Sequence, residues 1–236
     1  MYEFTSRVRY SEIRPDGTMS VGSLIRRMQD CSVFHSESIG RGPEFWLESG
    51  YGWMIVSWQI ALHAMPRFGM PVTTKTWSYR FRGIEGDRNF VVLDEDGRLL
   101  AEANSIWIYF DLNAQKPIRV PDEEMNGFGV EEPLSSFSNT KRKIALPPVW
   151  DEEMEPLHVQ PMNIDTNGHV NNLVYIEMAL EYVPADFPVR EIRVQYLAQA
   201  RMGDVLIPRC FRDGGRLLVA LGTPGGESYA VAEFLS

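Results

Sequence analysis

The chain has 236 residues, of which 44% are hydrophobic and 23% are charged, a composition typical of globular proteins with one large or two small domains. Its formal net charge of −9 argues against a nucleic-acid-binding protein, because such proteins are usually basic. No stretch approaches the roughly 20 apolar residues of a membrane span, and the N-terminus lacks the apolar segment of a signal peptide. The only two cysteines lie far apart in the sequence. We therefore expect a cytoplasmic protein without a disulfide framework.

The first half is predicted to begin with a turn and a long helix. Residues 15–17 have the Pro-Asp-Gly sequence of a turn, Ser20 can cap a helix over residues 21–39, and Gly40 can end it. Four side chains spaced by three or four residues would share one buried face of this helix. They are Leu24, Met28, Cys31 and His35.

Four strands are predicted to follow this helix as an antiparallel meander. The Asp-Glu-Asp-Gly sequence at residues 94–97 would join the last two strands as a hairpin. The predicted strands span residues 53–64, 72–81, 88–93 and 99–110.

The second half repeats this plan. Residues 122–150 are rich in proline, serine and acidic side chains and are interpreted as a linker. A helix over residues 172–182, ended by Pro184, then precedes four strands, and an Asp-Gly-Gly turn at residues 213–215 echoes the first hairpin. These strands are predicted at residues 191–199, 205–211, 216–221 and 228–234.

Each half therefore reads as a strand, one long helix and an antiparallel meander, which gives an α+β domain. A helix wrapped by a curved antiparallel sheet is the hotdog arrangement, and two tandem copies would resemble a hotdog homodimer in one chain. The predicted organisation is an N-terminal domain at 1–121, the linker at 122–150 and a C-terminal domain at 151–236. The chain would be a monomer with pseudo-dimeric halves or a homodimer.

A carboxylate, an amide and an imidazole recur at every second residue just before the second helix, on Asp165, Asn167 and His169. Alternate side chains of an extended backbone point to one side. The three groups would then form an acid–base cluster beside a helix N-terminus. The plainer interpretation is that Asp-Thr-Asn-Gly forms a turn and that Asn171 and Asn172 cap the helix, with no catalysis involved.

This stretch resembles the Asp-x-Asn-x-His-Val-Asn-Asn-x-x-Tyr-Ile signature of acyl–acyl carrier protein (acyl-ACP) thioesterases, because it runs Asp165-Thr166-Asn167-Gly168-His169-Val170-Asn171-Asn172 and continues to Tyr175-Ile176. The N-terminal half is similar to bacterial members of that family at residues 10–39, 52–53, 105–107 and 116–121. The resemblance implies a tandem hotdog fold. It also implies a thiolester hydrolase of fatty acid biosynthesis that releases free fatty acid from acyl-ACP, with ACP as partner and without a cofactor.

The resemblance also implies site residues. The Asp, Asn and His of the family's active site fall on Asp165, Asn167 and His169, and the position of a further catalytic Glu falls on Gln199. Gln199 can orient water or a carbonyl but cannot act as a base. His169, or Asp165 acting with it, would be the general base, Asn167 and Gln199 would hold water and the carbonyl, and backbone N–H groups near residues 170–172 would stabilise the oxyanion.

Comparison of the two halves predicts a single active site. When Gly17 is placed over Gly168, Arg14 and Thr18 fall at the positions of Asp165 and His169. The first half then lacks the acid–base pair and would supply the acyl pocket instead. Candidate pocket residues are aromatic or apolar side chains of the predicted strands, which are more often core residues. They are Trp53, Met54, Trp58, Phe81 and Trp107.

Two alternatives remain open at this point. One is an acyl-CoA thioesterase with the same catalytic residues, and the other is a non-catalytic hotdog protein that binds acyl groups or ACP, which Gln199 keeps possible. The remaining histidines have no metal-binding spacing, so no metal site is expected. Because ACP is acidic, a local basic patch would have to bind it. The candidate patches are Arg26-Arg27 and residues 141–143.

Overall fold

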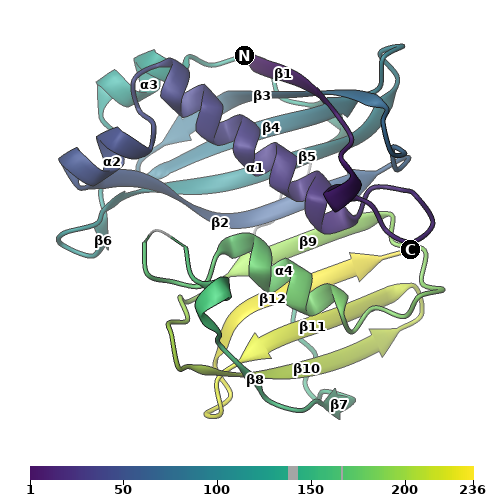
Figure 1. The fold of residues 1–236 in the computed structure, drawn as a ribbon. Helices are drawn as coiled ribbons and strands as arrows, with labels where there is room; N and C mark the ends of the chain where they lie inside the picture. Colours follow the sequence, from purple (N-terminus) through teal and green to yellow (C-terminus); the bar gives the residue numbers. More distant parts are fainter. Residues whose placement is uncertain (138–142, 166) are drawn as a thin grey trace. The chain divides into compact units, whose positions relative to one another are not determined.

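The computed structural model describes residues 1–137, 143–165 and 167–236, which form two compact units. Unit 1 is built from the chain before residue 138, apart from Ser57–Gln59, and unit 2 from the remainder. Each unit contains few helices and an antiparallel sheet (Figure 1), which confirms the predicted α+β class. Among the helices of the described residues, none is both long enough and apolar enough to cross a membrane.

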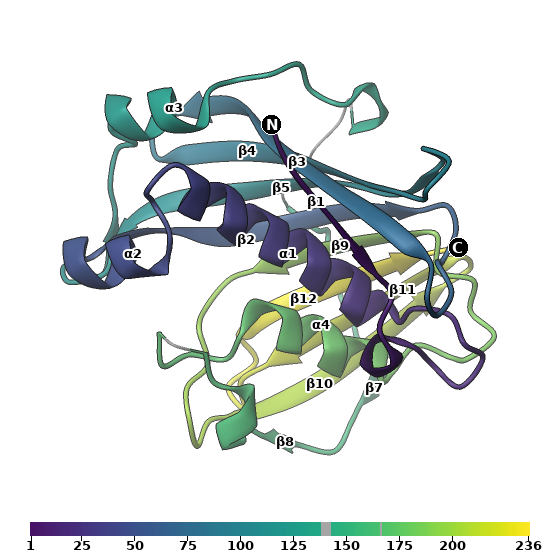
Figure 2. The ribbon, with the colours of Figure 1, turned by 45° about the horizontal axis from the view of Figure 1, so that its top comes forward.

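The antiparallel sheet of unit 1 has the strand order β1-β3-β4-β5-β2, and the short strand β6 pairs with β5. Figure 2 shows the long helix α1 lying across one face of this sheet, where it contacts β1 and β3. The elements are β1 (Tyr2–Arg7), η1 (Tyr10–Glu12), α1 (Val21–Ser38), α2 (Pro43–Ser49), β2 (Tyr51–Leu62), β3 (Pro71–Arg82), β4 (Glu85–Leu93), β5 (Leu99–Asp111), β6 (Lys116–Pro117), α3 (Asp122–Phe128) and η2 (Ser135–Phe137).

Helix α1 forms where the sequence predicts it. The side chain of Ser20 accepts a hydrogen bond from the Ser23 N–H, which satisfies a donor at the open end of the helix. Gly40 has φ +72, a left-handed conformation that ends helices and that glycine adopts without strain. The predicted apolar face is buried, as Leu24, Met28 and Cys31 are 0% exposed and His35 is 5% exposed.

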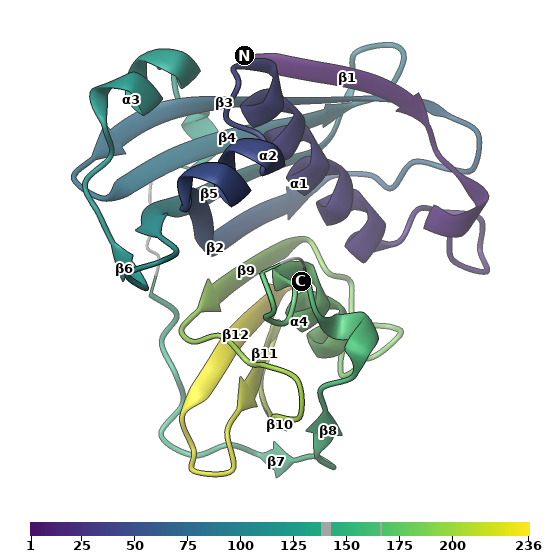
Figure 3. The ribbon, with the colours of Figure 1, turned by 60° about the vertical axis from the view of Figure 1, so that its left-hand side comes forward.

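Unit 2 repeats the strand order of unit 1, as β7-β10-β11-β12-β9, and its helix α4 contacts β11 and β12 (Figure 3). The capping asparagine predicted from the sequence is present, since the Asn171 side chain accepts from the Leu173 N–H at 2.9 Å. The elements are β7 (Glu152–Glu153), β8 (Leu157–His158), η3 (Pro161–Asn163), α4 (Asn172–Leu180), β9 (Glu191–Tyr196), β10 (Val205–Asp213), β11 (Arg216–Gly222) and β12 (Ser228–Leu235).

Strand β9 ends earlier than predicted, at Tyr196 rather than residue 199. The N–H groups of Leu197 and Ala198 both donate to the carbonyl of Tyr229, at 2.8 and 3.2 Å. Two successive residues sharing one acceptor break the regular ladder, as at a β-bulge. The chain beyond Tyr196 is therefore free to leave the sheet and approach the start of α4.

Much of the described part of the stretch predicted as a linker packs against one unit or the other. Helix α3 buries Phe128, and the Leu134 N–H donates to Asn89 Oδ1 at 2.9 Å in unit 1. In unit 2, Ile144 is 2% exposed and packs against Leu218 and Val231. The division between the two units falls inside this stretch, and its two ends help to cover the two sheets.

Candidate active site

The segment that carries the polar motif is a closed turn. Ile164 and Val170 form an antiparallel bridge, the Asp165 N–H donates to the His169 carbonyl at 2.9 Å, and the Gly168 N–H donates to the Asp165 carbonyl at 3.1 Å. Gly168 makes the reversal possible with φ +78. The predicted extended backbone is therefore wrong, and Asp165 and His169 are paired across the turn instead of alternating along a strand.

The side chains of this turn have distinct environments. One carboxylate oxygen of Asp165 accepts the Asn167 N–H at 2.8 Å, and Asn167 is exposed. His169 is half-buried; burial and, next, the positive charge of Arg201 lower the pKa of its imidazole, while Asp165 acts to raise it. With a pKa below its usual 6.5, His169 is largely neutral at pH 7 and can accept a proton.

Backbone N–H groups at the start of α4 are mostly engaged with the protein itself. The Val170 N–H donates to the Ala200 carbonyl and the Asn171 N–H donates to the Asn163 carbonyl, both at 2.9 Å. The Leu173 N–H is held by the capping side chain. The predicted oxyanion hole at residues 170–172 is therefore wrong for at least two of its three N–H groups, because these already have acceptors.

The segment after β9 is tied to the turn and to α4 through Ala200. Its carbonyl accepts the Val170 N–H, and its own N–H donates to the hydroxyl of Tyr175 at 2.7 Å. Tyr175 is 2% exposed and Ala200 is 0% exposed, so both bonds are shielded from water. Gln199, which precedes Ala200 and is exposed, is thereby brought to the same region as His169.

Unit 1 contains a second turn with the same backbone. Ile13 and Met19 form the equivalent bridge, the Arg14 N–H donates to the Thr18 carbonyl at 2.8 Å, and the Gly17 N–H donates to the Arg14 carbonyl at 2.9 Å. Gly17 has φ +79, within a degree of Gly168. The predicted superposition of Gly17 on Gly168 is thus matched bond for bond.

The side chains of the first turn satisfy one another. The Thr18 hydroxyl donates to Asp16 at 2.6 Å, and an Arg14 nitrogen donates to Thr18 at 3.0 Å. Hydrogen bonds from Thr18 lower the pKa of Asp16, which makes its carboxylate a weaker base. The turn has no imidazole, so only the second turn combines a carboxylate with a neutral histidine.

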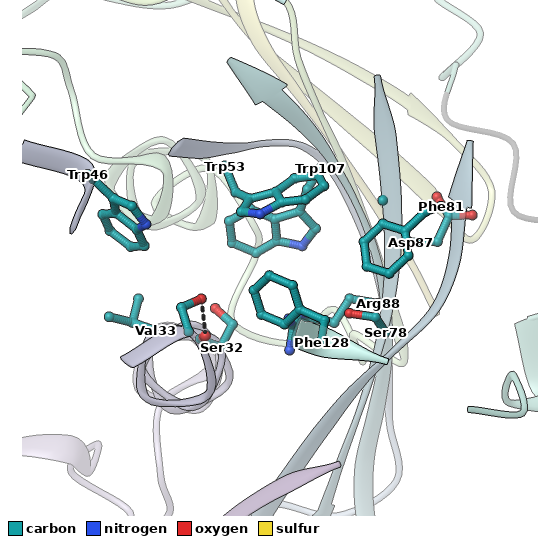
Figure 4. A pocket seen from close by; sticks show the side chains of 12 residues that line it. Ser32, Val33, Trp46, Trp53, Ser78, Phe81, Asp87, Arg88, Trp107 and Phe128 are labelled. Atoms are coloured by element: carbon teal, nitrogen blue, oxygen red, sulfur yellow. Dashed lines mark hydrogen bonds between the residues drawn. The ribbon is translucent and has the colours of Figure 1, made fainter. Parts of the chain in front are cut away.

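Unit 1 also contains a pocket of about 410 Å³, part of it open to solvent (Figure 4). Three of the five predicted pocket residues, Trp53, Phe81 and Trp107, line it. Met54 and Trp58 do not. Both differ from Trp53 by an odd number of residues along β2, so their side chains point to the opposite face, and Trp58 is 3% exposed. The aromatic wall consists of Trp46, Trp53, Phe81, Trp107 and Phe128.

One side of the pocket is polar. Arg88, on β4, is 6% exposed, and its Nη1 donates to His35 Nδ1 at 2.9 Å and to Thr76 Oγ1 at 3.1 Å. Its guanidinium lies 5.0 Å from the ring centre of Phe128. Burial and the Arg88 charge lower the pKa of His35 to about 3, and burial lowers the pKa of Arg88 to about 10. His35 is therefore neutral and accepts at Nδ1, while Arg88 remains charged.

A buried carboxylate anchors the aromatic wall from outside the pocket. Glu124, on α3, is 2% exposed and accepts the Trp53 indole N–H at 3.1 Å. It also forms an ion pair with Arg41 at 2.8 Å. Burial raises the pKa of Glu124 against the effect of these partners. Through this contact, α3 fixes the position of a tryptophan that faces the pocket.

The basic patch predicted at Arg26-Arg27 is wrong for Arg27. Arg27 is 3% exposed, pairs with Glu12 at 3.5 Å and donates to the carbonyls of Ser6 and Val72, both at 3.2 Å. It therefore joins α1 to the edge of the sheet and is not available to a partner. Of the patch at residues 141–143, only Lys143 lies within the described residues, and it is exposed.

Sequence reasoning missed three buried polar residues around these sites. Arg88 could have been found, because it alternates with Phe90 and Val92, which are both 0% exposed. Tyr175 lies in the recognised signature, although nothing in the pattern indicates that its hydroxyl binds the Ala200 N–H. Glu124 lay in the predicted linker and gave no signal. Across the described residues, no cluster of three or more His, Cys, Asp or Glu side chains could hold a metal ion.

Comparison with known proteins covers both units. The family model for the acyl-ACP thioesterase N-terminal domain matches residues 1–128, and that for the C-terminal domain matches residues 148–210. The chain is 25% identical over 195 residues to a chloroplastic palmitoyl-acyl carrier protein thioesterase of Cuphea hookeriana, which covers 76% of the chain. It spans only 46% of that relative, about half its length.

Two solved structures share the fold over 99% of the chain. One is an acyl-ACP thioesterase from Bacteroides thetaiotaomicron, with a TM-score of 0.87, 24% identity and 96% of its own chain covered. The other is a 12:0-ACP thioesterase from Umbellularia californica, with a TM-score of 0.86, 21% identity and 96% of its own chain covered.

Proposed function

The chain belongs to the acyl-ACP thioesterase family, and we propose that it hydrolyses the thioester of a fatty acyl group carried on ACP, releasing free fatty acid and ACP. Each unit is then a hotdog domain, with the acyl pocket in unit 1 and the catalytic turn in unit 2. The division of the chain, the shared strand order and the separate locations of the pocket and the polar turn support this assignment.

One observation carries the proposal. The two turns share their bridge, their two backbone hydrogen bonds and a left-handed glycine. If both turns served only to start a helix, similar side chains would suffice in the two units. Only the second turn has a carboxylate and a half-buried, neutral imidazole at its two ends, in Asp165 and His169. Acid–base chemistry is thus the property that distinguishes it from its counterpart.

In the proposed reaction, His169, or Asp165 acting with it, takes a proton from water as the water oxygen bonds to the thioester carbonyl carbon. The carbonyl oxygen becomes an oxyanion, and in this proposal the amides of Asn167 and Gln199 stabilise it or hold the water. When the carbonyl re-forms, the carbon–sulfur bond breaks and the thiolate leaves. The proton held by the base then passes to the thiolate or to solvent, and the acid product and the thiol account for all atoms.

The partner in this proposal is ACP, which is acidic, and the chain carries a net charge of −9. Exposed cations must therefore bind ACP against an overall repulsion, and added salt should weaken the complex. Arg201, which is exposed and close enough to His169 to influence its pKa, is a candidate contact at the entrance to the catalytic turn.

Release of free thiol tests the function directly. The purified chain would be incubated with acyl-ACPs from octanoyl to stearoyl and with the matched acyl-CoAs, and the thiol and fatty acid would be measured together. Faster hydrolysis of acyl-ACP supports the proposal. Faster hydrolysis of acyl-CoA would show that the carrier is CoA and not ACP. Binding of ACP without thiol release would show a non-catalytic acyl- or ACP-binding protein.

A further inference from the structure

The pocket of unit 1 places a buried guanidinium within aromatic walls. Arg88 is 6% exposed and lines the pocket together with Phe81, Trp107 and Phe128. Its side-chain hydrogen bonds to the described residues all start from Nη1, which donates to His35 and Thr76. For Nε and Nη2, the described residues provide no acceptor, and no carboxylate among them forms an ion pair with Arg88.

A buried arginine without a counter-ion is unusual, because a charge removed from water normally requires a paired and hydrogen-bonded partner. A packing role for Arg88 is already fulfilled by Nη1 and by the contact with the Phe128 ring. The remaining donors therefore point to an acceptor supplied by a ligand. A planar guanidinium with two adjacent donor nitrogens matches the two oxygens of a carboxylate.

The groups that surround Arg88 in the protein cannot supply the negative charge of a counter-ion. Asp87 also lines the pocket, but its carboxylate pairs with Arg80 and points away from the Arg88 guanidinium in Figure 4. His35 is neutral and accepts from Arg88 at Nδ1. Burial raises the pKa of the Cys31 thiol to about 12, so Cys31 is uncharged as well. Each group next to Arg88 is either neutral or already paired.

We propose that Arg88 forms a carboxylate-binding subsite inside the acyl pocket, and that its ligand is a carboxylate at one end of an alkyl chain. The aromatic wall suits the chain and the guanidinium suits the head. The identification of the chain as fatty acyl rests on the proposed function. Two sources share this chemistry: the free fatty acid product, bound with its head at Arg88, and an acyl substrate that carries a second carboxyl group at its far end.

Binding of decanoate and of 1-decanol to the wild-type protein tests the subsite without any turnover. Isothermal titration calorimetry should show decanoate binding at least tenfold more tightly than 1-decanol. The bound carboxylate should also shift the 15N signals of the neutral His35 imidazole, which accepts from Arg88, in a titration with decanoate at pH 7. Equal affinities, or decanoate binding that leaves the His35 signals unchanged, would overturn the proposal.

Two variants separate the subsite from a general charge effect. Arg88→Met should reduce the preference for decanoate over 1-decanol to less than threefold. Arg82→Met removes an exposed cation from the end of the neighbouring strand and should preserve the preference. If Arg88→Met does not fold, the wild-type affinities and the His35 signals at pH 7 decide the question. If a folded Arg88→Met protein keeps the full preference for decanoate, the proposed subsite is refuted.

Kinetic measurements then distinguish the two sources. If the ligand is the product, free decanoate inhibits hydrolysis of decanoyl-ACP, and Arg88→Met removes the inhibition. If it is a substrate group, an ω-carboxyacyl-ACP is hydrolysed faster than the methyl-terminated acyl-ACP of the same length, and Arg88→Met reverses that order. The subsite is rejected if neither effect occurs in an active enzyme. Failure of hydrolysis with every substrate would instead contradict the proposed function. The subsite would then be tested by the affinities for decanoate and 1-decanol alone.

Discussion

The backbone N–H of Val170 donates to the carbonyl oxygen of Ala200 at 2.9 Å. This bond joins the turn that carries Asp165 and His169 to the segment that carries Gln199. The same contact exists in unit 1, where the Met19 N–H donates to the Pro66 carbonyl at 2.8 Å. The position of the candidate catalytic groups is therefore set by a repeated backbone scaffold, and side-chain chemistry alone differs between the two copies.

Replacement of Tyr175 by Phe should loosen this scaffold. The Tyr175 hydroxyl accepts the N–H of fully buried Ala200, and its loss leaves that donor unsatisfied, at a cost of about 1–3 kcal/mol. We expect the free energy of unfolding in urea to fall by that amount. Tyr182→Phe, on the last turn after α4, provides a control with the same change, and an equal loss in both variants would contradict the role of the Ala200 bond.

The pKa of His169 should respond in opposite directions to its two charged neighbours. Arg201 lowers this pKa, so Arg201→Met should raise it. Asp165 acts to raise it, so Asp165→Asn should lower it further. NMR titration of the His169 imidazole measures both shifts without requiring activity. If His169 is the base, the acid limb of kcat/KM should move to higher pH in Arg201→Met, because the base must be neutral. Shifts in the same direction would refute the electrostatic arrangement.

Stabilisation of the oxyanion should depend on side-chain amides. The N–H groups of Val170 and Asn171 are already bound to carbonyls, and we propose the side-chain amides of Asn167 and Gln199 as donors. Loss of one oxyanion donor typically lowers kcat by about 10²–10³, and we expect losses of that order in Asn167→Ala or Gln199→Ala. The exposed neighbour Leu197 provides the control. A Gln199→Ala enzyme with the kcat of Leu197→Ala would exclude Gln199 from this role.

Stability should fall in mild acid because of His35. Its pKa is about 3 in the folded protein and near 6.5 when exposed. Between these values the unfolded chain binds the additional proton, so the free energy of unfolding decreases as pH falls from about 6.5 towards 3 and is fully retained above 6.5. His35→Gln keeps an acceptor for Arg88 but cannot titrate. Urea unfolding across this range should show a shallower pH dependence in the variant, whereas identical slopes would contradict the prediction.

Much of the fold could be predicted because local signals agree with the tertiary structure. Helix α1 has its cap at Ser20, its stop at Gly40 and one continuous apolar face. Helix α3 was missed although the three acidic residues in its first turn are typical of a helix start. Composition suggested a linker there, and only the packing of Phe128 and Glu124 shows that the segment belongs to unit 1.

The residues of the candidate site stay a prediction, and the backbone geometry predicted for them was wrong. The alternation of Asp165 and His169 assumed an extended backbone, but Asn-Gly at residues 167–168 favours a reversal, and Gly168 adopts it. Arg88 was missed although it alternates with the buried Phe90 and Val92, because arginine is rarely fully buried without a paired charge. The alignment of Gly17 with Gly168 succeeded, since a left-handed glycine fixes the register of both turns.

We propose that the chain has one active site, on the second turn. The most direct test of this proposal is the rate of free fatty acid release from acyl-ACP by His169→Ala compared with Thr18→Ala, the matching change in the first turn. Removal of a general base should lower kcat by about 10²–10⁴ in His169→Ala, while Thr18→Ala should keep nearly the wild-type rate. Wild-type activity in His169→Ala, or equal losses in the two variants, would contradict a single site at Asp165 and His169.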